Sequence, residues 1–395
     1  MRRTAWISIL GLLALVALLQ AEFTFFTPSG SFAVEVSLDN SSLLRLPIYR
    51  NAITSLEVVG DTVVGGTSAN PGLSPFIFTV SLSKRRVEEV LDLSKIVAGQ
   101  RAVQSGFARG TQGVLFAGTL PNRTDEGGHL IEVRLVDGRI EVRDLGSPVP
   151  GEEVFAVEAS QQAPFVYGVS YPSGRFFVFD LRENRTRLFE ETHPSATTLA
   201  FLSNYALKAE DILTRRLIVD RNGRVYGSLP VNKLFRFDPV SQKVEILPEE
   251  LPEGWGRKPL GRVDAWAMSS DGMLYGGNAA DGQLFRLDPD TGRVTNLGKP
   301  IQMPRLRGLA FAADGKLYGV GGAVPGYTHL FSYDPKGKGY SDLGNPRFVM
   351  SGPGLEQGIF WRGFQIGTLA ASEDGRYIVM GEEEALSQIM VFPIN

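Results

Sequence analysis

The sequence predicts an all-β fold: a seven-bladed β-propeller with four-stranded antiparallel blades. Three observations lead to this prediction. Short apolar runs are separated by turns in a chain with 45 glycines, one short segment recurs seven times, and its copies lie 43 to 61 residues apart. Repeats of about 40 to 50 residues with several strands in each copy are typical of propellers.

The recurring segment has two apolar residues and then at least one glycine within the next two positions. Its copies are VVGG (63–66), LFAG (115–118), VYGV (166–169), VYGS (225–228), LYGG (274–277), LYGV (317–320) and IVMG (378–381). One four-stranded sheet cannot bury both of its faces, whereas sheets packed radially bury the faces of one another. The repeat therefore predicts a ring of blades.

The fifth copy shows how one unit is built. Alternating large apolar residues predict four strands, at 264–270, 273–278, 283–288 and 293–298. Asp271-Gly272 predicts a hairpin turn between the first two strands, because such turns need positive φ. Asp288-Pro289 begins the turn between the last two.

The two ends of the chain are expected to share the last blade. The segment QIMVFPIN (388–395) is the third strand of the seventh unit and ends the chain, so an outer strand is missing there. The apolar segment SFAVEVSL (31–38) can supply it and close the ring. Before the fourth blade, the segment 203–217 is the best candidate for a short helix.

The repeat also carries a family resemblance. LYGG followed by LFRLDPDTG (284–292) resembles the kelch repeat and related exported bacterial propellers, including streptogramin-lyase-like and YVTN-type ones. The resemblance covers nearly the whole mature chain and concerns a repeat, not an active site. The tryptophan common late in kelch repeats is replaced by TNLG and SDLG. The tryptophan-docking repeat of quinoprotein dehydrogenases is also missing, so we expect no quinone cofactor and no other cofactor.

The N-terminus resembles an export signal. Arg2 and Arg3 precede an uncharged apolar run at 5–19, and Ala21 is a small residue at the possible cleavage site. The run is short for a membrane span, which needs about 20 residues. We therefore expect a signal peptide or an uncleaved anchor at 1–21, followed by the propeller at 22–395. The protein would be periplasmic or extracellular, with membrane association possible through 5–19.

Charge and cysteine content exclude several classes of protein. Forty basic and 43 acidic residues give a net charge of −3, so nothing in the total charge favours nucleic acid as a partner. The absence of cysteine excludes disulfides, thiolate metal sites and cysteine nucleophiles.

Arginines and tryptophans gather on one predicted face of the ring. The turns within hairpins on one side are short and alike, whereas the loops on the other side are long and varied, as binding loops usually are. The candidate ligand-binding residues on that side are Arg262, Arg305, Arg307, Arg362, Trp255 and Trp361. Guanidinium groups suit carboxylates or sulfates, and tryptophan faces suit sugar rings. Alternatively, these arginines pair with neighbouring acids.

Histidine is scarce. Of three histidines, His129 and His329 occupy matching places before the third strand of the second and sixth units. No histidine spacing predicts a metal site. If the protein is an enzyme, His329 and Tyr327, close to Arg305 and Arg307 in sequence, form the best candidate cluster for acid–base catalysis.

Three functions are compatible with these features. The first is an exported binding or assembly module that recognises a protein or a polyanionic glycan on its loop-rich face. The second is a lyase or hydrolase of acidic polysaccharide on the same scaffold. The third is an accessory subunit of a membrane-associated complex, held by an uncleaved N-terminal helix.

Overall fold

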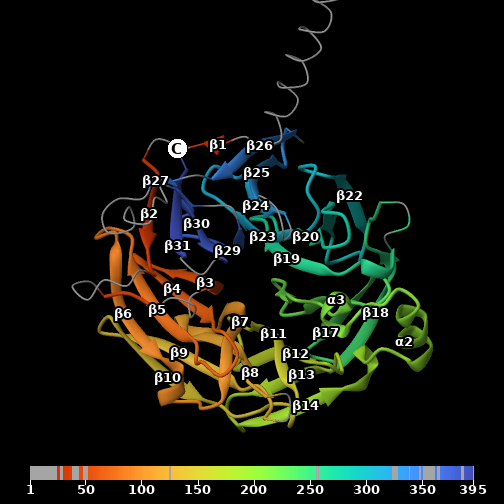
Figure 1. Ribbon diagram of the computed structural model, residues 1–395. Coiled ribbons are helices and arrows are strands. Elements are labelled where there is room, and N and C mark those ends of the chain that lie inside the picture. The colour runs from red at the N-terminus through yellow and green to blue at the C-terminus, as the bar shows by residue number, and fades with distance from the viewer. Residues whose placement is uncertain are drawn as a thin grey trace, which may run out of the picture.

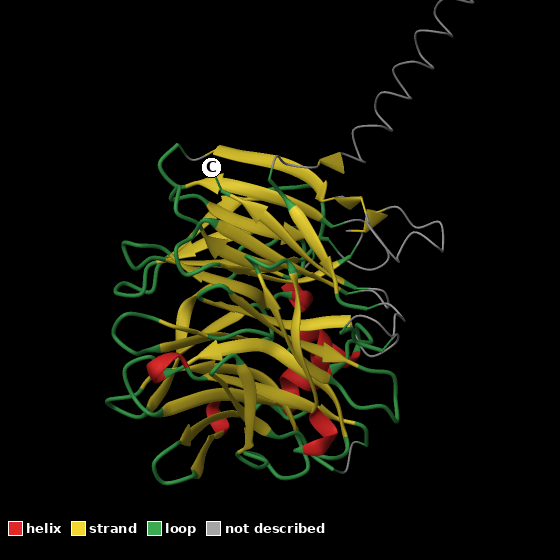
Figure 2. Ribbon diagram, turned by 90° about the vertical axis from the view of Figure 1, so that its left-hand side faces the viewer, coloured by secondary structure: helices red, strands yellow, loops and turns green. Residues whose placement is uncertain are grey.

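The computed structural model shows sheets standing around a central axis, with connecting loops on both sides of the ring (Figure 1, Figure 2). The residues it describes are 25–26, 30–37, 44–47, 52–123, 126–254, 256, 258–322, 328–337, 339–346, 348–349, 361–362, 365–383 and 387–394. The expected 1–21 segment, Trp255 and Tyr327 lie outside these residues, and of Trp361 and Arg362 only the backbone is described.

Hydrogen bonding separates five blades of antiparallel strands. One blade contains β11 (Glu153–Ala159), β12 (Phe165–Tyr171), β13 (Phe176–Asp180) and β14 (Arg185–Phe189). The next contains β15 (Ile218–Val219), β16 (Val225–Leu229), β17 (Lys233–Asp238) and β18 (Lys243–Glu250). A third contains β19 (Val263–Met268), β20 (Leu274–Asn278), β21 (Leu284–Leu287) and β22 (Val294–Gly298).

The other two blades lie near the chain ends (Figure 1). One contains β23 (Leu306–Phe311), β24 (Leu317–Gly321), β25 (His329–Asp334) and β26 (Gly339–Pro346), with β1 (Phe25–Phe26) added in parallel; the other contains β29 (Ile366–Ala371), β30 (Tyr377–Glu382), β31 (Gln388–Pro393) and β2 (Phe32–Glu35). In the second, β2 pairs antiparallel with β31, and Phe32 faces Val391 in the register. A two-stranded pair, β27 (Phe348–Val349) and β28 (Trp361–Arg362), lies outside the blades.

The first two predicted units form one curved eight-stranded sheet. It contains β3 (Ala52–Val59), β4 (Thr62–Ser68), β5 (Phe76–Ser81), β6 (Arg86–Asp92), β7 (Gln100–Arg109), β8 (Leu115–Pro121), β9 (Leu130–Val136) and β10 (Arg139–Asp144). Seven separate sheets are therefore not observed. The reason is local: β7 begins so close to the end of β4 that Ser68 and Ala102 pair and join two antiparallel meanders. The all-β propeller with four-stranded antiparallel blades is confirmed.

The repeated glycine has a steric cause. Gly276 in β20 lies opposite Phe285 in β21, and a Cβ at position 276 would overlap the ring of Phe285. The same cross-strand pairing and the same overlap recur in four other units, at Gly65–Phe78, Gly168–Phe177, Gly227–Phe235 and Gly319–Phe331. The motif is thus repeated because each phenylalanine ring needs the space that a side chain would occupy.

The core consists of apolar clusters between neighbouring sheets. Tyr226 of β16 and Leu274 of β20 belong to one such cluster, and Val391 of β31 and Ile53 of β3 belong to another. The second cluster joins strands from the two ends of the chain. Burial of apolar side chains between neighbouring sheets therefore helps to hold the ring together.

A helical insertion precedes β15. It contains α2 (Ala196–Ser203), where the Ser195 hydroxyl accepts a hydrogen bond from the Thr198 amide, and α3 (Ala209–Ile212). In place of the expected helix at 203–217 there are two short ones: α2 ends at residue 203, and α3 lies within the expected range. Short 3-10 turns lie at Leu93–Lys95, Thr111–Gly113, Glu190–Thr192 and Lys258–Leu260. Within the described residues, no helix has the length and apolar character needed to cross a membrane.

Candidate functional site

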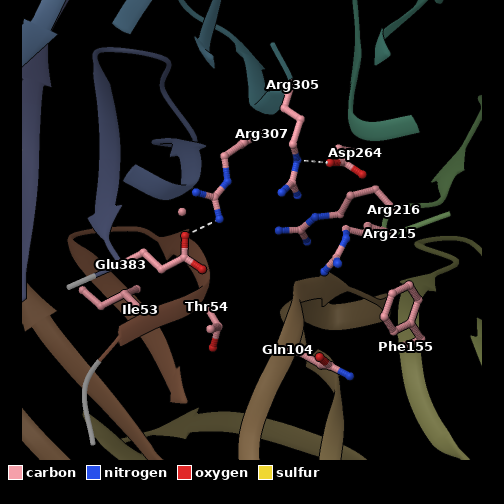
Figure 3. A pocket seen from close by; sticks show the side chains of 11 residues that line it. Ile53, Thr54, Gln104, Phe155, Arg215, Arg216, Asp264, Arg305, Arg307 and Glu383 are labelled. Carbon is pink, nitrogen blue, oxygen red and sulfur yellow. Dashed lines mark hydrogen bonds and ion pairs between the residues drawn. The ribbon is translucent and has the colours of Figure 1, made fainter. Parts of the chain in front are cut away.

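A cavity of about 120 Å³ lies on the ring axis, at the ends of the inner strands that face the longer loops (Figure 3). We call it the upper cavity. All seven predicted units contribute to it, because the inner strand of each unit starts there. Its lining is Ile53, Thr54, Gln104, Phe155, Arg215, Arg216, Asp264, Arg305, Arg307, Gly367 and Glu383.

The charged and uncharged side chains occupy different parts of the wall. The four lining arginines and Asp264 come from the fourth to sixth units, with Glu383 beside them. Ile53, Thr54, Gln104 and Phe155 come from the first three units and lie across the cavity (Figure 3). The cavity therefore offers cationic donors on one side and mostly uncharged surface on the other.

Asp264 holds two of the surrounding arginines. Its Oδ1 accepts a hydrogen bond from Nε of Arg262 at 2.7 Å, and its Oδ2 accepts one from Nε of Arg305 at 2.8 Å. Burial alone would raise the pKa of Asp264, but the charges of Arg262, Arg305 and Arg215 outweigh it and hold the pKa well below its usual value. Asp264 is therefore a fixed anion that orients the arginines.

The predicted arginines have different roles. Arg305 and Arg307 line the upper cavity, and Arg307 pairs with Glu383. Arg262 is buried behind the wall, where it also donates to the backbone carbonyl of Asp211. Each of these three arginines therefore pairs with an acidic side chain, as the alternative interpretation of the sequence expected. The structure does not describe the side chain of Arg362.

Counting back from the hairpin turns of the sequence also places Arg215 near this mouth, although it was not among the candidate ligand-binding residues. Its guanidinium lies 5.1 Å from the centre of the Phe155 ring, and Nη2 donates to the carbonyl of Glu210 at 3.2 Å. Its Nε is buried and has no hydrogen-bond partner among the described residues. Burial lowers the pKa of Arg215, yet guanidinium keeps its proton at any ordinary pH. Arg215 thus brings a positive charge to the cavity wall, and no ion pair with a carboxylate is formed by it within the described structure.

Arg216, also missed, is accommodated by an irregularity in β7. The register of β7 against β8 shifts between Gln104 and Ala108, and Gly106 within this bulge has φ of +76°. A Cβ at position 106 would overlap the guanidinium of Arg216. Only glycine fits there, both for its backbone angle and for its size. The bulge therefore leaves room for Arg216 in the central channel, which is the space along the ring axis that contains the upper cavity.

A second cavity of about 220 Å³ lies further along the inner strands; we call it the lower cavity. Arg216 and Arg307 line both cavities, whereas Glu57 and Glu158 line only the lower one. Nη2 of Arg109 donates to Glu57 at 2.9 Å. Burial raises the pKa of Glu158 to about 7, and the nearby charge of Arg216 lowers it only in part.

His329 does not line either cavity. Its Nδ1 lies 3.0 Å from both carboxylate oxygens of Asp342, and its Nε2 is buried without a hydrogen-bond partner among the described residues. The amide of Gly344 also donates to Asp342, at 2.8 Å. This arrangement, which we call the clasp, joins the start of the third strand of the unit to its fourth strand.

The same arrangement recurs in two other units. In the second, His129 contacts Asp144, and the Gly146 amide donates to that carboxylate. In the fifth, Asn296 donates to Gln283, and the Gly298 amide donates to Asn296. Because an amide pair replaces the His–Asp pair there, the clasp itself needs no acid–base group. The catalytic role of His329 and Tyr327 stays a prediction.

Among the described residues, no three His, Cys, Asp or Glu side chains gather in a way that could hold a metal ion. No family model matches the sequence. No curated protein matches it either.

Similarity to solved structures is extensive but remote in sequence. Streptogramin B lyase is 9% identical over 92% of this chain and 98% of that chain, with a TM-score of 0.62. An inactive variant of virginiamycin B lyase from Staphylococcus aureus, solved with quinupristin, is 10% identical over 92% and 100%, with a TM-score of 0.60. The β-propeller domain of Cps50 (Swd1) from Myceliophteria thermophila is 11% identical over 87% and 97%, with a TM-score of 0.57. The fold that this chain shares with these proteins is the β-propeller.

Proposed function

We propose that this protein is a binding module that takes an acidic side chain of a partner protein into its upper cavity. The observation that carries the proposal is the excess of positive charge there. Four arginines line the cavity and Arg262 lies behind it, whereas two carboxylates, Asp264 and Glu383, line the same cavity. In a partly enclosed site such an excess attracts an anion strongly.

The compact arrangement of the charges favours a single acidic group over a polyanionic chain. A long polyanion needs basic residues along a track, but these guanidinium groups converge on one cavity of about 120 Å³. Three other basic side chains near the loop-rich face are paired with acids: Lys233 and Lys258 share Glu250, and Arg175 contacts Glu152. A protein partner is therefore preferred to a polyanionic glycan.

The uncharged part of the wall suits the carbon chain that carries the acidic group. Ile53 and Phe155 can contact methylene groups while the carboxylate faces Arg215 and Arg305. A carboxylate on a short carbon chain, as in glutamate, uses both parts of the wall. An inorganic anion uses only one. Arg215 is the residue best placed to add a hydrogen bond, because Arg305 and Arg307 each pair with a carboxylate, whereas Arg215 contacts a backbone carbonyl in the described structure.

A second part of the proposal concerns the number of blades and the closure of the ring. We propose seven blades, with the two meanders of the eight-stranded sheet as the first and second, and with β2 as the strand that closes the last blade. The seven apolar clusters between successive groups of four strands and the pairing of β2 with β31 support this.

We also propose that residues 22–395 form the propeller and that 1–21 direct it out of the cytoplasm, to the periplasm or the exterior. An accessory subunit anchored by 5–19 is the alternative. Mass spectrometry of the natural protein distinguishes the two. An N-terminus near Glu22 supports export with cleavage, and retention of Met1 or Arg2 in a membrane fraction supports the anchor.

Calorimetric titration with N-acetyl-glutamate amide tests the binding function. This probe presents one side-chain carboxylate and has no charged termini, and N-acetyl-glutamine amide is its neutral match. We expect saturable binding of the acid only, weakened by salt because screening reduces charge attraction. Arg215→Gln should weaken binding at least about tenfold, since a charge-assisted hydrogen bond contributes about 1.5–3 kcal/mol.

Arg376→Gln is the matched control, because Arg376 is exposed and pairs with Asp374 in a hairpin turn. It should bind the probe as the wild type does. Equal binding of the acid and the amide would contradict a carboxylate site. Binding of an oligouronate without binding of the acidic probe would show that the glycan hypothesis is correct instead.

A further inference from the structure

One arginine connects the two cavities of the channel. Arg216 lines both, and the glycine bulge of β7 leaves room for its guanidinium between them. Of the carboxylates that act on Arg216, Glu158 acts most strongly, followed by Asp264 and Glu57. The charge of this guanidinium is thus shared between a carboxylate of the lower cavity and any anion in the upper one.

Glu158 has few groups that favour its ionised form. One carboxylate oxygen accepts a hydrogen bond from the amide of Ala159 at 2.9 Å. The charged groups that face it are Arg216, which precedes β15, and Glu57 on β3. Arg307 of β23 lines the same cavity. Because Glu57 is already paired with Arg109, Arg216 is the main cation available to Glu158.

We propose that the channel binds its acidic group together with one proton, and that Glu158 takes up this proton. The inference rests on the proposed function and adds to it a second binding site, for a proton, in the lower cavity. While Glu158 is ionised, it neutralises part of the charge of Arg216. When Glu158 is protonated, more of that charge acts on the upper cavity, and the anion binds more tightly.

The chemistry of the two groups fits this coupling. A carboxylate enclosed by protein titrates above its usual range, and burial raises the pKa of Glu158 to about 7. An anion placed in the upper cavity adds a further negative charge near Arg216 and raises that pKa more. By linkage, the proton must then raise the affinity for the anion by the same factor.

The test is the pH dependence of binding of N-acetyl-glutamate amide, whose side chain stays ionised between pH 6 and pH 8. If the protonated form is the binding form, its population falls from about nine-tenths to about one-tenth over this range, and the dissociation constant should rise about tenfold. Glu158→Gln imitates the protonated state. Its dissociation constant should stay flat with pH, near the wild-type value at pH 6.

Glu153→Gln is the matched control. Burial raises the pKa of Glu153 to about 7 as well, but Glu153 lies near Arg101 and Glu210 and lines neither cavity. This variant should keep the wild-type pH dependence. If Glu158→Gln also keeps it, or if Glu153→Gln loses it, the assignment to Glu158 is wrong.

A second measurement needs no variant. Calorimetric titration of the wild type at pH 7, in two buffers with different enthalpies of ionisation, gives the number of protons taken up with the probe. We expect uptake of about half a proton, because about half of the Glu158 side chains are ionised at this pH. Binding without proton uptake would overturn this inference and leave the proposed function standing. Absence of binding at any pH would overturn the proposed function itself.

Discussion

The residues that pack the blades repeat from unit to unit, whereas the residues that line the upper cavity mostly do not. In the blades, one solution is repeated: a glycine such as Gly276 faces a phenylalanine such as Phe285 in five of the units. In the upper cavity the contributions vary around the ring, from Ile53 in the first unit to pairs of arginines in the fourth and sixth. Positions that repeat serve packing, which is the same in every blade. Positions that do not repeat build a site with a charged and an uncharged side.

The largest effect should follow from loss of the anion that organises the channel arginines. Asp264→Asn leaves the buried Arg262 with no counter-charge and removes the partner of the half-buried Arg305, so we expect a loss of about 3–5 kcal/mol in the free energy of unfolding. Denaturant titration measures it. Asp374→Asn, in an exposed turn, is the control and should change stability little. Similar losses in both variants would show that Asp264 is not an organising charge.

In the blades, Gly276→Ala should have the next largest effect. The new methyl group overlaps the Phe285 ring, and overpacking costs about 1–3 kcal/mol. Gly339→Ala, where a Cβ meets nothing within 4 Å, should be nearly neutral. The folded Gly276→Ala protein should still bind the acidic probe as the wild type does. Loss of binding at unchanged stability would contradict the separation between packing and site positions.

Sequence periodicity predicted the blades because the same steric requirement recurs, and it placed Arg305 and Arg307 before an inner strand. Counting back from the Asn222-Gly223 turn in the same way leads to Arg215 and Arg216, so a signal for them existed. The space for Arg216 could not be predicted, because it depends on a bulge in β7, two units away in the ring. The fused eight-stranded sheet was missed because it depends on one pairing between β4 and β7.

The two histidines illustrate a repeated feature that was considered as a site. His129 and His329 occupy equivalent places, and an acid–base role for His329 is a prediction that the structure does not test. The structure shows that Gln283 fills the same place in the fifth unit. A residue that recurs at one position of the repeat is more often part of the scaffold, and comparison among the units of one chain can reveal this.

The third prediction concerns stability and pH. The pKa of Glu158 is raised in the folded protein to about 7, so its favourable contribution is complete below the unfolded value near 4.5 and is lost as pH rises through about 7. Glu158→Gln removes this loss. Its stability relative to wild type should therefore increase by about 1–2 kcal/mol between pH 5 and pH 8, a value reduced because the carboxylate still reaches water in the lower cavity. Chemical denaturation at several pH values measures it, and a constant difference would contradict the raised pKa.

The smallest effect should come from the clasp that repeats in three units. His329→Gln can donate to Asp342 through its side-chain amide nitrogen, and glutamine already fills the equivalent place in the fifth unit, where Gln283 accepts a hydrogen bond from Asn296. We therefore expect a change below about 1 kcal/mol in the free energy of unfolding. His329→Leu is the contrast. It fills the place with an apolar side chain but leaves the Gly344 amide as the neighbouring donor to Asp342, so it should destabilise by about 1–3 kcal/mol. If glutamine is as harmful as leucine, the imidazole itself is required. The repeat would then not explain His329, and an acid–base role for it would again be the better hypothesis.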